Sequence, residues 1–238
     1  MSAHLLLRLE APMLSLGSPA VDQRRPVQRW PAASLLTGLL GNALGCRRDR
    51  PAALDRLQER LRWAARIDRA GHPFTDFQTA QLHADESGWT TRGTVETRAG
   101  GANTYDAPHI RWRNYRADAS LAVALRLDPT DEAPTLDDLA AALQHPARPL
   151  FIGRKNCLPS QRLLVGLVDA ADTVAALAQC PLSHDADAEP ALFCRDPAVA
   201  WPGPEIGHRS SDERRFALDV HAGQQTIREL LAPATTTP

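Results

Sequence analysis

The prediction of the fold starts from residues 23–48, which have the sequence QRRPVQRWPAASLLTGLLGNALGCRR. Its apolar side chains return every three or four residues, which predicts one buried face of an α-helix. Ser34 stands just before them and is expected to cap the helix N-terminus. Gly38 and Gly41 weaken a helix, so we expect another backbone to pass close to them. The apolar face consists of Leu35, Leu36, Leu39, Leu40, Ala43 and Leu44.

Arg24, Arg25 and Arg29 precede this helix. The first N–H groups of a helix lack partners inside it, and together with the helix dipole they favour an anion such as phosphate. Two interpretations stay open at this point. The stretch is either an ordinary core helix with solvated arginines or the place where an RNA backbone meets the fold.

Length and composition set the class of protein. The chain has 238 residues, of which 43% are apolar, enough for one large domain or two small ones. No apolar run approaches the roughly 20 residues of a membrane-spanning helix, and Arg8 interrupts the apolar N-terminal residues. We therefore expect a cytoplasmic protein without membrane contact. Four widely spaced cysteines lack metal-ligand spacing, so neither a metal nor another cofactor is expected.

Charge divides the chain into two parts. Residues 1–126 contain 18 Arg and 12 Asp or Glu, a balance of +6, whereas residues 127–238 contain 9 basic and 16 acidic residues, a balance of −7. The basic part is therefore the candidate for binding a polyanion.

The order of predicted elements in the first 155 residues is β-α-β-β-α-β. Strands are expected at residues 4–10, 61–68, 74–81, 117–127 and 150–152, and helices at 34–44, from 51 onward, and at 135–144. This order is typical of an α+β, ferredoxin-like (split βαβ, RRM-like) core. Further along, we expect a strand at 163–168, a helix capped by Asp169 or Asp172 and ending near 178, weak strands at 192–193 and 216–220, and a disordered tail at 232–238.

Residues 82–108 interrupt this core. They are rich in glycine and threonine and have few apolar side chains, which indicates either a disordered surface loop or a long β-hairpin that becomes ordered on a partner. The next residues, HIRWRNYR at 109–116, alternate. On a strand, Arg111, Arg113 and Tyr115 share one face and Trp112 lies on the other. Interleaved arginine and aromatic side chains suit phosphate contact and base stacking.

Residues 153–155, Gly-Arg-Lys, follow the strand expected at 150–152. A glycine followed by two cations can let an RNA backbone approach closely. The same residues can equally form a simple turn.

Four segments resemble those of a known family. They are LLLRLEAPMLSLGSP (5–19), RRPVQRWPAASLLTGLLGNALG (24–45), RWRNYRADASLAVAL (111–125) and FIGRKNCLPS (151–160). In this order the chain resembles the CasD-type subunits of the type I-E CRISPR surveillance complex, Cascade, within the RAMP superfamily. The likeness covers about the first 160 residues. Two positions depart from the family pattern, Leu16 where Trp is frequent and Gln78 where His is frequent.

The resemblance implies a fold and a role. It implies a ferredoxin-like domain over residues 1–155 with an inserted thumb hairpin at about 78–115, and a less regular C-terminal part at 156–238. It also implies a non-catalytic subunit that holds the 5′ handle of the CRISPR RNA, contacts the backbone subunit CasC, helps to anchor the large subunit CasA, and meets target DNA only through the complex.

The residues expected to bind RNA lie in three segments. They are Arg24, Arg25, Arg29 and Ser34; His109, Arg111, Trp112, Arg113, Tyr115 and Arg116; and Gly153, Arg154 and Lys155. A rival interpretation comes from type I-C relatives, in which the corresponding subunit is a metal-independent endoribonuclease. Such an enzyme needs groups such as His109, Tyr115 or Lys155 near the scissile phosphate. For Trp112, packing at the root of the hairpin is the alternative to an RNA contact.

Overall fold

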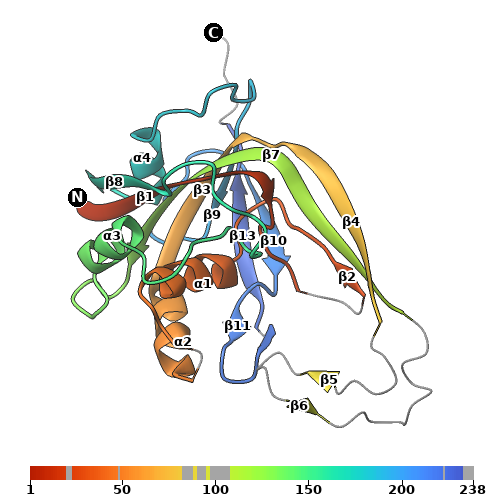
Figure 1. The fold of residues 1–238 in the computed structure, drawn as a ribbon. Coiled ribbons are helices and arrows are strands. Elements are labelled where there is room, and N and C mark those ends of the chain that lie inside the picture. The colour runs from red at the N-terminus through yellow and green to blue at the C-terminus, as the bar shows by residue number, and fades with distance from the viewer. Residues whose placement is uncertain are drawn as a thin grey trace.

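The computed structural model describes residues 1–19, 23–47, 49–81, 88–89, 95–96, 108–221 and 223–232. In this part of the chain a nine-stranded sheet dominates, and four helices pack on it (Figure 1). The main path of the sheet runs β10-β13-β9-β3-β7-β1-β8, and β2 and β4 also pair with β7. The strands of this sheet are β1 (Ser2–Leu14), β2 (Arg24–Arg25), β3 (Leu61–Arg69), β4 (His72–Ala80), β7 (His109–Leu127), β8 (Leu164–Ala170), β9 (Ala191–Cys194), β10 (Glu205–Ser210) and β13 (Gln225–Leu230).

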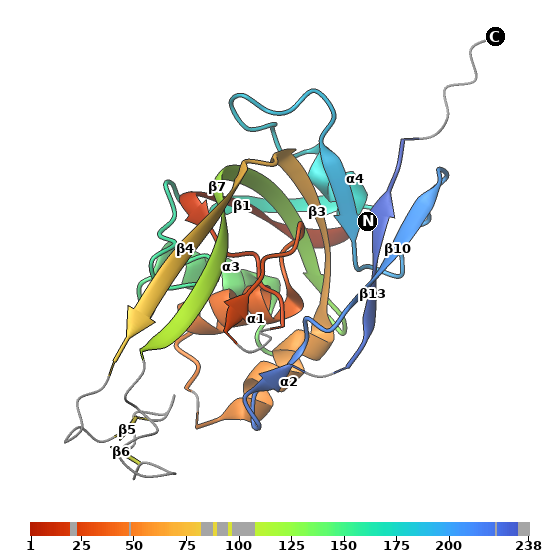
Figure 2. The same ribbon diagram turned by 90° about the vertical axis from the view of Figure 1, so that its right-hand side faces the viewer.

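The helices are α1 (Ala33–Ala43), α2 (Pro51–Arg60), α3 (Leu136–Gln144) and α4 (Thr173–Ala178). Helix α1 lies inside the curve of the sheet (Figure 2), where its leucines join α3 and the inward side chains of β1, β3 and β7 in the main core. Helix α4 covers the opposite face in a smaller core with Leu6 and Ala124. The two short pairs β5 (Gly88–Trp89) with β6 (Val95–Glu96) and β11 (Arg214–Arg215) with β12 (Val220–His221) stand apart from the large sheet.

Several sequence-based elements are confirmed. The alternation at 117–127 belongs to β7, the helix at 135–144 is α3 with its Thr135–Asp138 capping box, and Asp172 caps α4. Within the sheet, β3, β7, β1 and β8 are neighbours in that order, and each is antiparallel to the next.

The start of α1 differs from the prediction. Ala32, not Ser34, is the N-cap residue, and no side chain of this segment caps the helix. The expected close backbone near the glycines is also wrong. A Cβ at Gly38 would meet no atom within 4 Å, and at Gly41 the nearest atom belongs to the Leu54 side chain of α2.

Strand β1 runs past its predicted end at residue 10. The register pairs Ala11 with Ala119 and Met13 with Ala117, so Pro12 lies opposite Asp118, whose φ is 55°. No ladder hydrogen bond is needed at such an irregularity, so the missing N–H of proline is tolerated there.

The strand predicted at 150–152 is absent, because the Ile152 N–H donates to Cys157 O (2.8 Å) and closes a loop. The place beside β1 is taken by β8, which corresponds to the strand expected at 163–168. The strand predicted at 216–220 is mostly the turn between β11 and β12. Strands β10 and β13 were not predicted. Most of the tail expected to be disordered, residues 233–238, lies outside the described residues, as does most of 82–107.

Strands from both parts of the predicted division, residues 1–155 and 156–238, belong to the same sheet, since β8 pairs with β1 and β9 pairs with β3. The division into two parts stays a prediction. None of the helices in the described ranges has the length and apolar character needed to cross a bilayer.

Candidate nucleic-acid interface

A two-stranded arm, residues 72–80 of β4 and 109–117 of β7, extends away from the helices (Figures 1 and 2). We call it the β4–β7 arm. On the other edge of β7, β2 pairs in parallel, with Arg24 beside Trp112 and Arg25 beside Arg113. The fold therefore brings two of the predicted RNA-binding segments together as adjacent strands.

The two faces of the β4–β7 arm differ in character. On the half-buried face, Asp76 lies opposite Arg113 in the strand register and Gln78 lies opposite Arg111. The exposed face carries Phe77 and Trp112, whose side chains are 51% and 42% exposed and whose ring centroids lie 4.7 Å apart. The faces assigned from the alternation at 109–116 agree with this arrangement. Trp112 packs against Phe77 of the paired strand and is 42% exposed, and its contact with RNA stays a prediction.

Tyr115 is the site residue whose surroundings differ most from expectation. It is 2% exposed, and its hydroxyl accepts a hydrogen bond from Asn156 Nδ2 (3.0 Å). The Arg154 guanidinium covers its ring at 4.6 Å from the centroid. Base stacking on Tyr115 is therefore excluded in this conformation, because protein groups occupy its ring and its hydroxyl.

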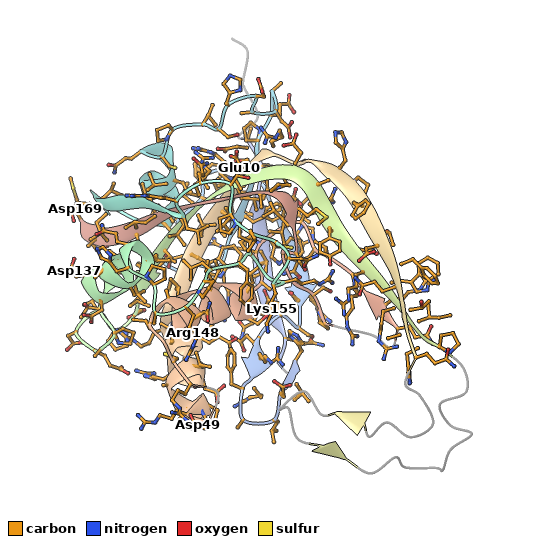
Figure 3. The ribbon with its side chains drawn as sticks, viewed as in Figure 1. Glu10, Asp49, Asp137, Arg148, Lys155 and Asp169 are labelled. Carbon is orange, nitrogen blue, oxygen red and sulfur yellow. The ribbon has the colours of Figure 1, made fainter. Side chains whose placement is uncertain are left out.

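Arg154 joins the three segments at this point. Its guanidinium donates to Asn114 O (3.0 Å) on β7 and to Arg25 O (3.2 Å) on β2. One side chain thus cross-links the arm, β2 and the loop that follows α3. Lys155, its neighbour, is exposed on that loop (Figure 3).

Gly153 is required by the protein's own backbone. Its φ is +86°, and a Cβ there would lie 1.8 Å from Ser15 O at the end of β1. The close approach predicted for an RNA backbone is therefore made by residue 15 of the chain itself.

We expect Gly153→Ala to lower the free energy of unfolding by at least about 2 kcal/mol, from left-handed strain and the clash together. Urea unfolding of the isolated chain measures this. Lys155→Ala is the matched control, and we expect it to change stability by no more than about 0.5 kcal/mol because the side chain is exposed. Equal stability of the two variants would contradict the assignment.

Arg29 lies in a different environment from Arg24. Its Nη1 is 3.0 Å from Glu229 Oε1 on β13, and its guanidinium stacks on Phe193 at 5.1 Å. The side chain is still 52% exposed. Among the described residues, Arg24, Arg111, Arg113 and Arg116 form no ion pair with an acidic side chain.

The N-terminus of α1 is already occupied by a carboxyl group of the chain itself. Ala33 N donates to Asp212 Oδ2 (3.1 Å), and Ser34 N donates to Asp212 O (3.2 Å). Asp212 is fully buried, and burial raises its pKa more than the Ala33 hydrogen bond lowers it. The prediction that a phosphate occupies this helix end is therefore wrong, because an internal carboxylate fills the position.

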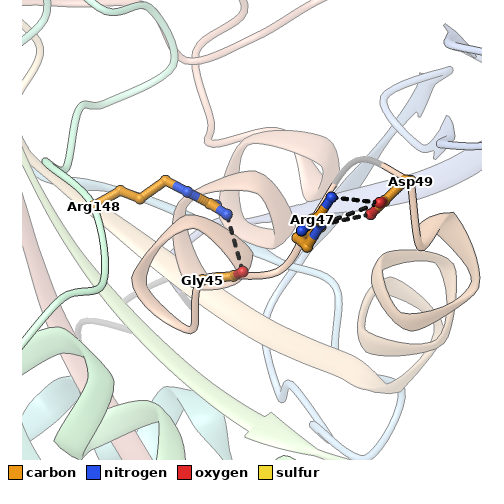
Figure 4. Close-up of a pocket in the computed structure, with 4 residues that line it drawn as sticks. All are labelled: Gly45, Arg47, Asp49 and Arg148. Atoms are coloured by element: carbon orange, nitrogen blue, oxygen red, sulfur yellow. Dashed lines mark hydrogen bonds and ion pairs between the residues drawn. The ribbon is translucent and has the colours of Figure 1, made fainter.

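An open depression at the other end of α1 is lined by Gly45, Arg47, Asp49 and Arg148 (Figure 4). Arg148 donates to Gly45 O (3.0 Å) and Cys46 O (2.9 Å), and Arg47 is paired with Asp49. Both arginines are thus engaged with the protein. The described residues contain no group of three side chains able to hold a metal ion.

The family of the chain follows from comparison with known proteins. A family model described as CRISPR-associated protein (Cas_Cas5) matches residues 4–222. The chain belongs to the Cas5 family. It is 32% identical over 177 residues to the CRISPR system Cascade subunit CasD of Escherichia coli (strain K12), covering 74% of this chain and 76% of that protein. The family resemblance seen in the four sequence segments is confirmed.

Solved structures of Cas proteins share the fold of this Cas5-family chain. One described as a CRISPR RNA-guided surveillance complex contains a chain with a TM-score of 0.65 and 26% identity, and 98% of our chain and 95% of that chain are covered. Another, described as the crystal structure of a Cas protein, has a TM-score of 0.55 at 23% identity, with 95% and 91% covered.

Sequence reasoning missed three residues that shape the candidate site of this Cas5-family chain. Phe77 lay in a predicted strand, but its contact with Trp112 depends on the hairpin register. Asp212 and Glu229 lie in the acidic C-terminal part, and no local pattern connects Asp212 with the Ala33 N–H or Glu229 with Arg29. Only the three-dimensional fold reveals these long-range contacts.

Proposed function

We propose that this Cas5-family chain is a non-catalytic RNA-binding subunit of a type I-E CRISPR surveillance complex, Cascade. In this proposal it holds the 5′ handle of the CRISPR RNA and caps the CasC backbone. Family membership, the identity to CasD and the likeness to a chain of a surveillance complex support this assignment.

The arrangement of strands supports the expected ferredoxin-like core. A split βαβ sheet has two central strands flanked by two others, all antiparallel, as are β3, β7, β1 and β8 in this chain. We propose that the β4–β7 arm is the base of the thumb expected at about 78–115, and the arm starts earlier, at His72.

The observation that carries the RNA-binding proposal is the strip formed by β4, β7 and β2. It places Arg24 next to Trp112 of the exposed aromatic pair, whereas Arg111 and Arg113 lie on the half-buried face of the same arm. Guanidinium groups bind phosphates, while exposed aromatic rings stack on unpaired bases. The proposed site also includes Arg25, Arg116, His109 and Lys155. Arg154 supports the strip through its hydrogen bonds to Asn114 O and Arg25 O. Ser34, Gly153 and Tyr115 contact other parts of the chain.

The proposed partners are the CRISPR RNA, CasC and CasA, with target DNA met only through the assembled complex. We propose a cytoplasmic location for the assembly.

Spacing along β7 argues against the endoribonuclease alternative. His109 and Tyr115 are six residues apart on one strand, and a rise of about 3.3 Å per residue separates them by about 20 Å. Tyr115 is also buried. His109, Tyr115 and Lys155 therefore do not meet around a single phosphate.

Two measurements test this function. In EDTA, the purified chain should leave CRISPR repeat RNA intact, and cleavage abolished by His109→Ala or Lys155→Ala would establish the nuclease instead. In the assembled complex, photocrosslinks from the 5′ handle should map to residues 24–25 and 109–116. Crosslinks confined to another face would overturn the RNA-binding proposal.

A further inference from the structure

Helix α1 depends on a distant residue for its N-terminus. Its own N-cap residue, Ala32, offers no side-chain acceptor. The first two N–H groups are satisfied by Asp212, which comes 179 positions after Ala33 and is fully buried. A helix without such an acceptor leaves its first N–H groups unpaired. The position of Asp212 therefore determines where α1 begins.

The residues just before α1 are also held by the C-terminal strands. Ser210 Oγ donates to Gln28 Oε1 (3.3 Å), and Glu229 binds Arg29 while its other oxygen lies 2.7 Å from His208 Nε2. The centroid of the Trp30 ring lies 5.2 Å from that of Phe193 and 5.1 Å from that of His208. Residues 26–32 have no helix or strand of their own. Their course is fixed by these contacts together with the hydrogen bonds from Gln28 N to Gly17 O (3.1 Å) and from Ala32 N to Leu16 O (2.8 Å).

This segment connects directly to the RNA-binding strip. It begins at β2, where Arg24 lies beside Trp112, and it ends at α1. Trp112 N donates to Gln23 O (3.0 Å), which fixes the first end to β7. The second end is fixed by Asp212. Nine residues thus connect the Asp212 contact at Ala33 with Arg24.

We propose that Asp212 is a positioning residue for RNA binding. It holds the arginine segment in place through α1, and Glu229 holds the same segment through Arg29. The inference rests on the proposed RNA-binding function. The expected change in RNA affinity is opposite to the one that simple electrostatics predicts. Removing a negative charge from the protein would by itself strengthen the binding of RNA.

The experiment compares Asp212→Ala with Asp212→Asn in the full chain. The probe is a fluorescent single-stranded RNA carrying the 5′ handle of the host repeat. Asparagine caps helices about as well as aspartate, whereas alanine does not. We expect RNA affinity to fall about fivefold to tenfold in Asp212→Ala and to stay within about twofold of wild type in Asp212→Asn, as expected for the loss of one cap. Deuterium uptake at residues 28–36 should rise in Asp212→Ala alone.

Glu205→Ala is the matched control. It removes the ion pair between Glu205 on β10 and Arg228 on β13, and neither residue contacts residues 26–32. It should leave RNA affinity and the uptake at residues 28–36 unchanged. If Asp212→Ala does not fold, Glu229→Ala against Glu229→Gln makes the same comparison at Arg29, with the same expected order.

The outcomes separate this inference from the proposed function. Equal affinity of the alanine and asparagine variants, or a gain of affinity in both, would overturn the positioning role. A wild-type chain that binds no RNA would overturn the proposed function and this role with it. Raised deuterium uptake without loss of affinity would leave Asp212 as a stability residue only and would also reject the proposal.

Discussion

Replacing Arg24, Arg111 and Arg113 together with alanine is expected to lower RNA affinity about a hundredfold at 0.1 M salt. Each contact of an arginine with a single-strand phosphate contributes about 0.7 to the log–log salt slope. Between 1 M and 0.1 M salt, one contact therefore raises the RNA affinity about fivefold, and three contacts raise it about a hundredfold. The slope itself should become shallower by about 2.

The stability of this variant should change little. These three arginines form no ion pairs among the described residues, and Arg24 is exposed. Titrations of labelled handle RNA at several salt concentrations measure both the affinity and the slope. Unfolding in urea shows whether the chain remains folded.

The matched control removes Arg47, Arg50 and Arg56, which alters net charge equally. Arg47 and Arg56 pair with Asp49 and Glu132, and all three residues lie near α2, outside the β4–β7 arm. We expect their replacement to leave the salt slope nearly unchanged. If both triple variants lose affinity equally, binding reflects overall charge, and the β4–β7–β2 strip is not the RNA site.

Local periodicity predicts the elements that form the main sheet and its helices. The three- and four-residue spacing of leucines gave α1, and period two gave β3 and the core half of β7. The same alternation placed Arg111, Arg113 and Tyr115 on one face. It could not show that Arg154 covers Tyr115, because that contact joins residues 39 positions apart.

The C-terminal part is where local patterns failed. Strands β10 and β13 lie in a proline- and glycine-rich region and become strands by pairing with each other and with β9. Asp212 likewise carries no local sign that it caps a helix near residue 33. Contacts of this kind depend on tertiary packing, so local sequence patterns cannot predict them.

Arg8 illustrates the same limit, since in the sequence it only interrupts an apolar run. In the structure it is buried on β1, where its guanidinium donates to Asp68 and to Pro181 O. Asp68 is fully buried and also accepts from Arg66 and from Ser183 N (3.0 Å). One carboxylate thus connects β1 and β3 with the loop that follows α4.

We expect Asp68→Ala to lower the free energy of unfolding by about 3–5 kcal/mol, because it leaves the buried Arg8 guanidinium without its partner charge. Asp49→Ala is the control. It removes an exposed partner of Arg47, and such surface pairs contribute little to stability. Chemical unfolding of both variants at neutral pH measures the difference. A loss of less than about 1 kcal/mol in Asp68→Ala would show that the network contributes little.

The same network predicts how stability depends on pH. Burial raises the pKa of Asp68, but the hydrogen bonds from Arg66 and Arg8 outweigh it, so the pKa lies below its usual value. A carboxyl with a lowered folded-state pKa stabilises the fold above its unfolded pKa of about 3.9, and this contribution is lost as pH falls through the folded value. The wild-type chain should therefore lose stability below about pH 4, and Asp68→Ala should lose less over the same range. Parallel acid titrations of the two proteins, followed by urea unfolding at each pH, test this directly, since equal acid sensitivity would remove Asp68 from the cause.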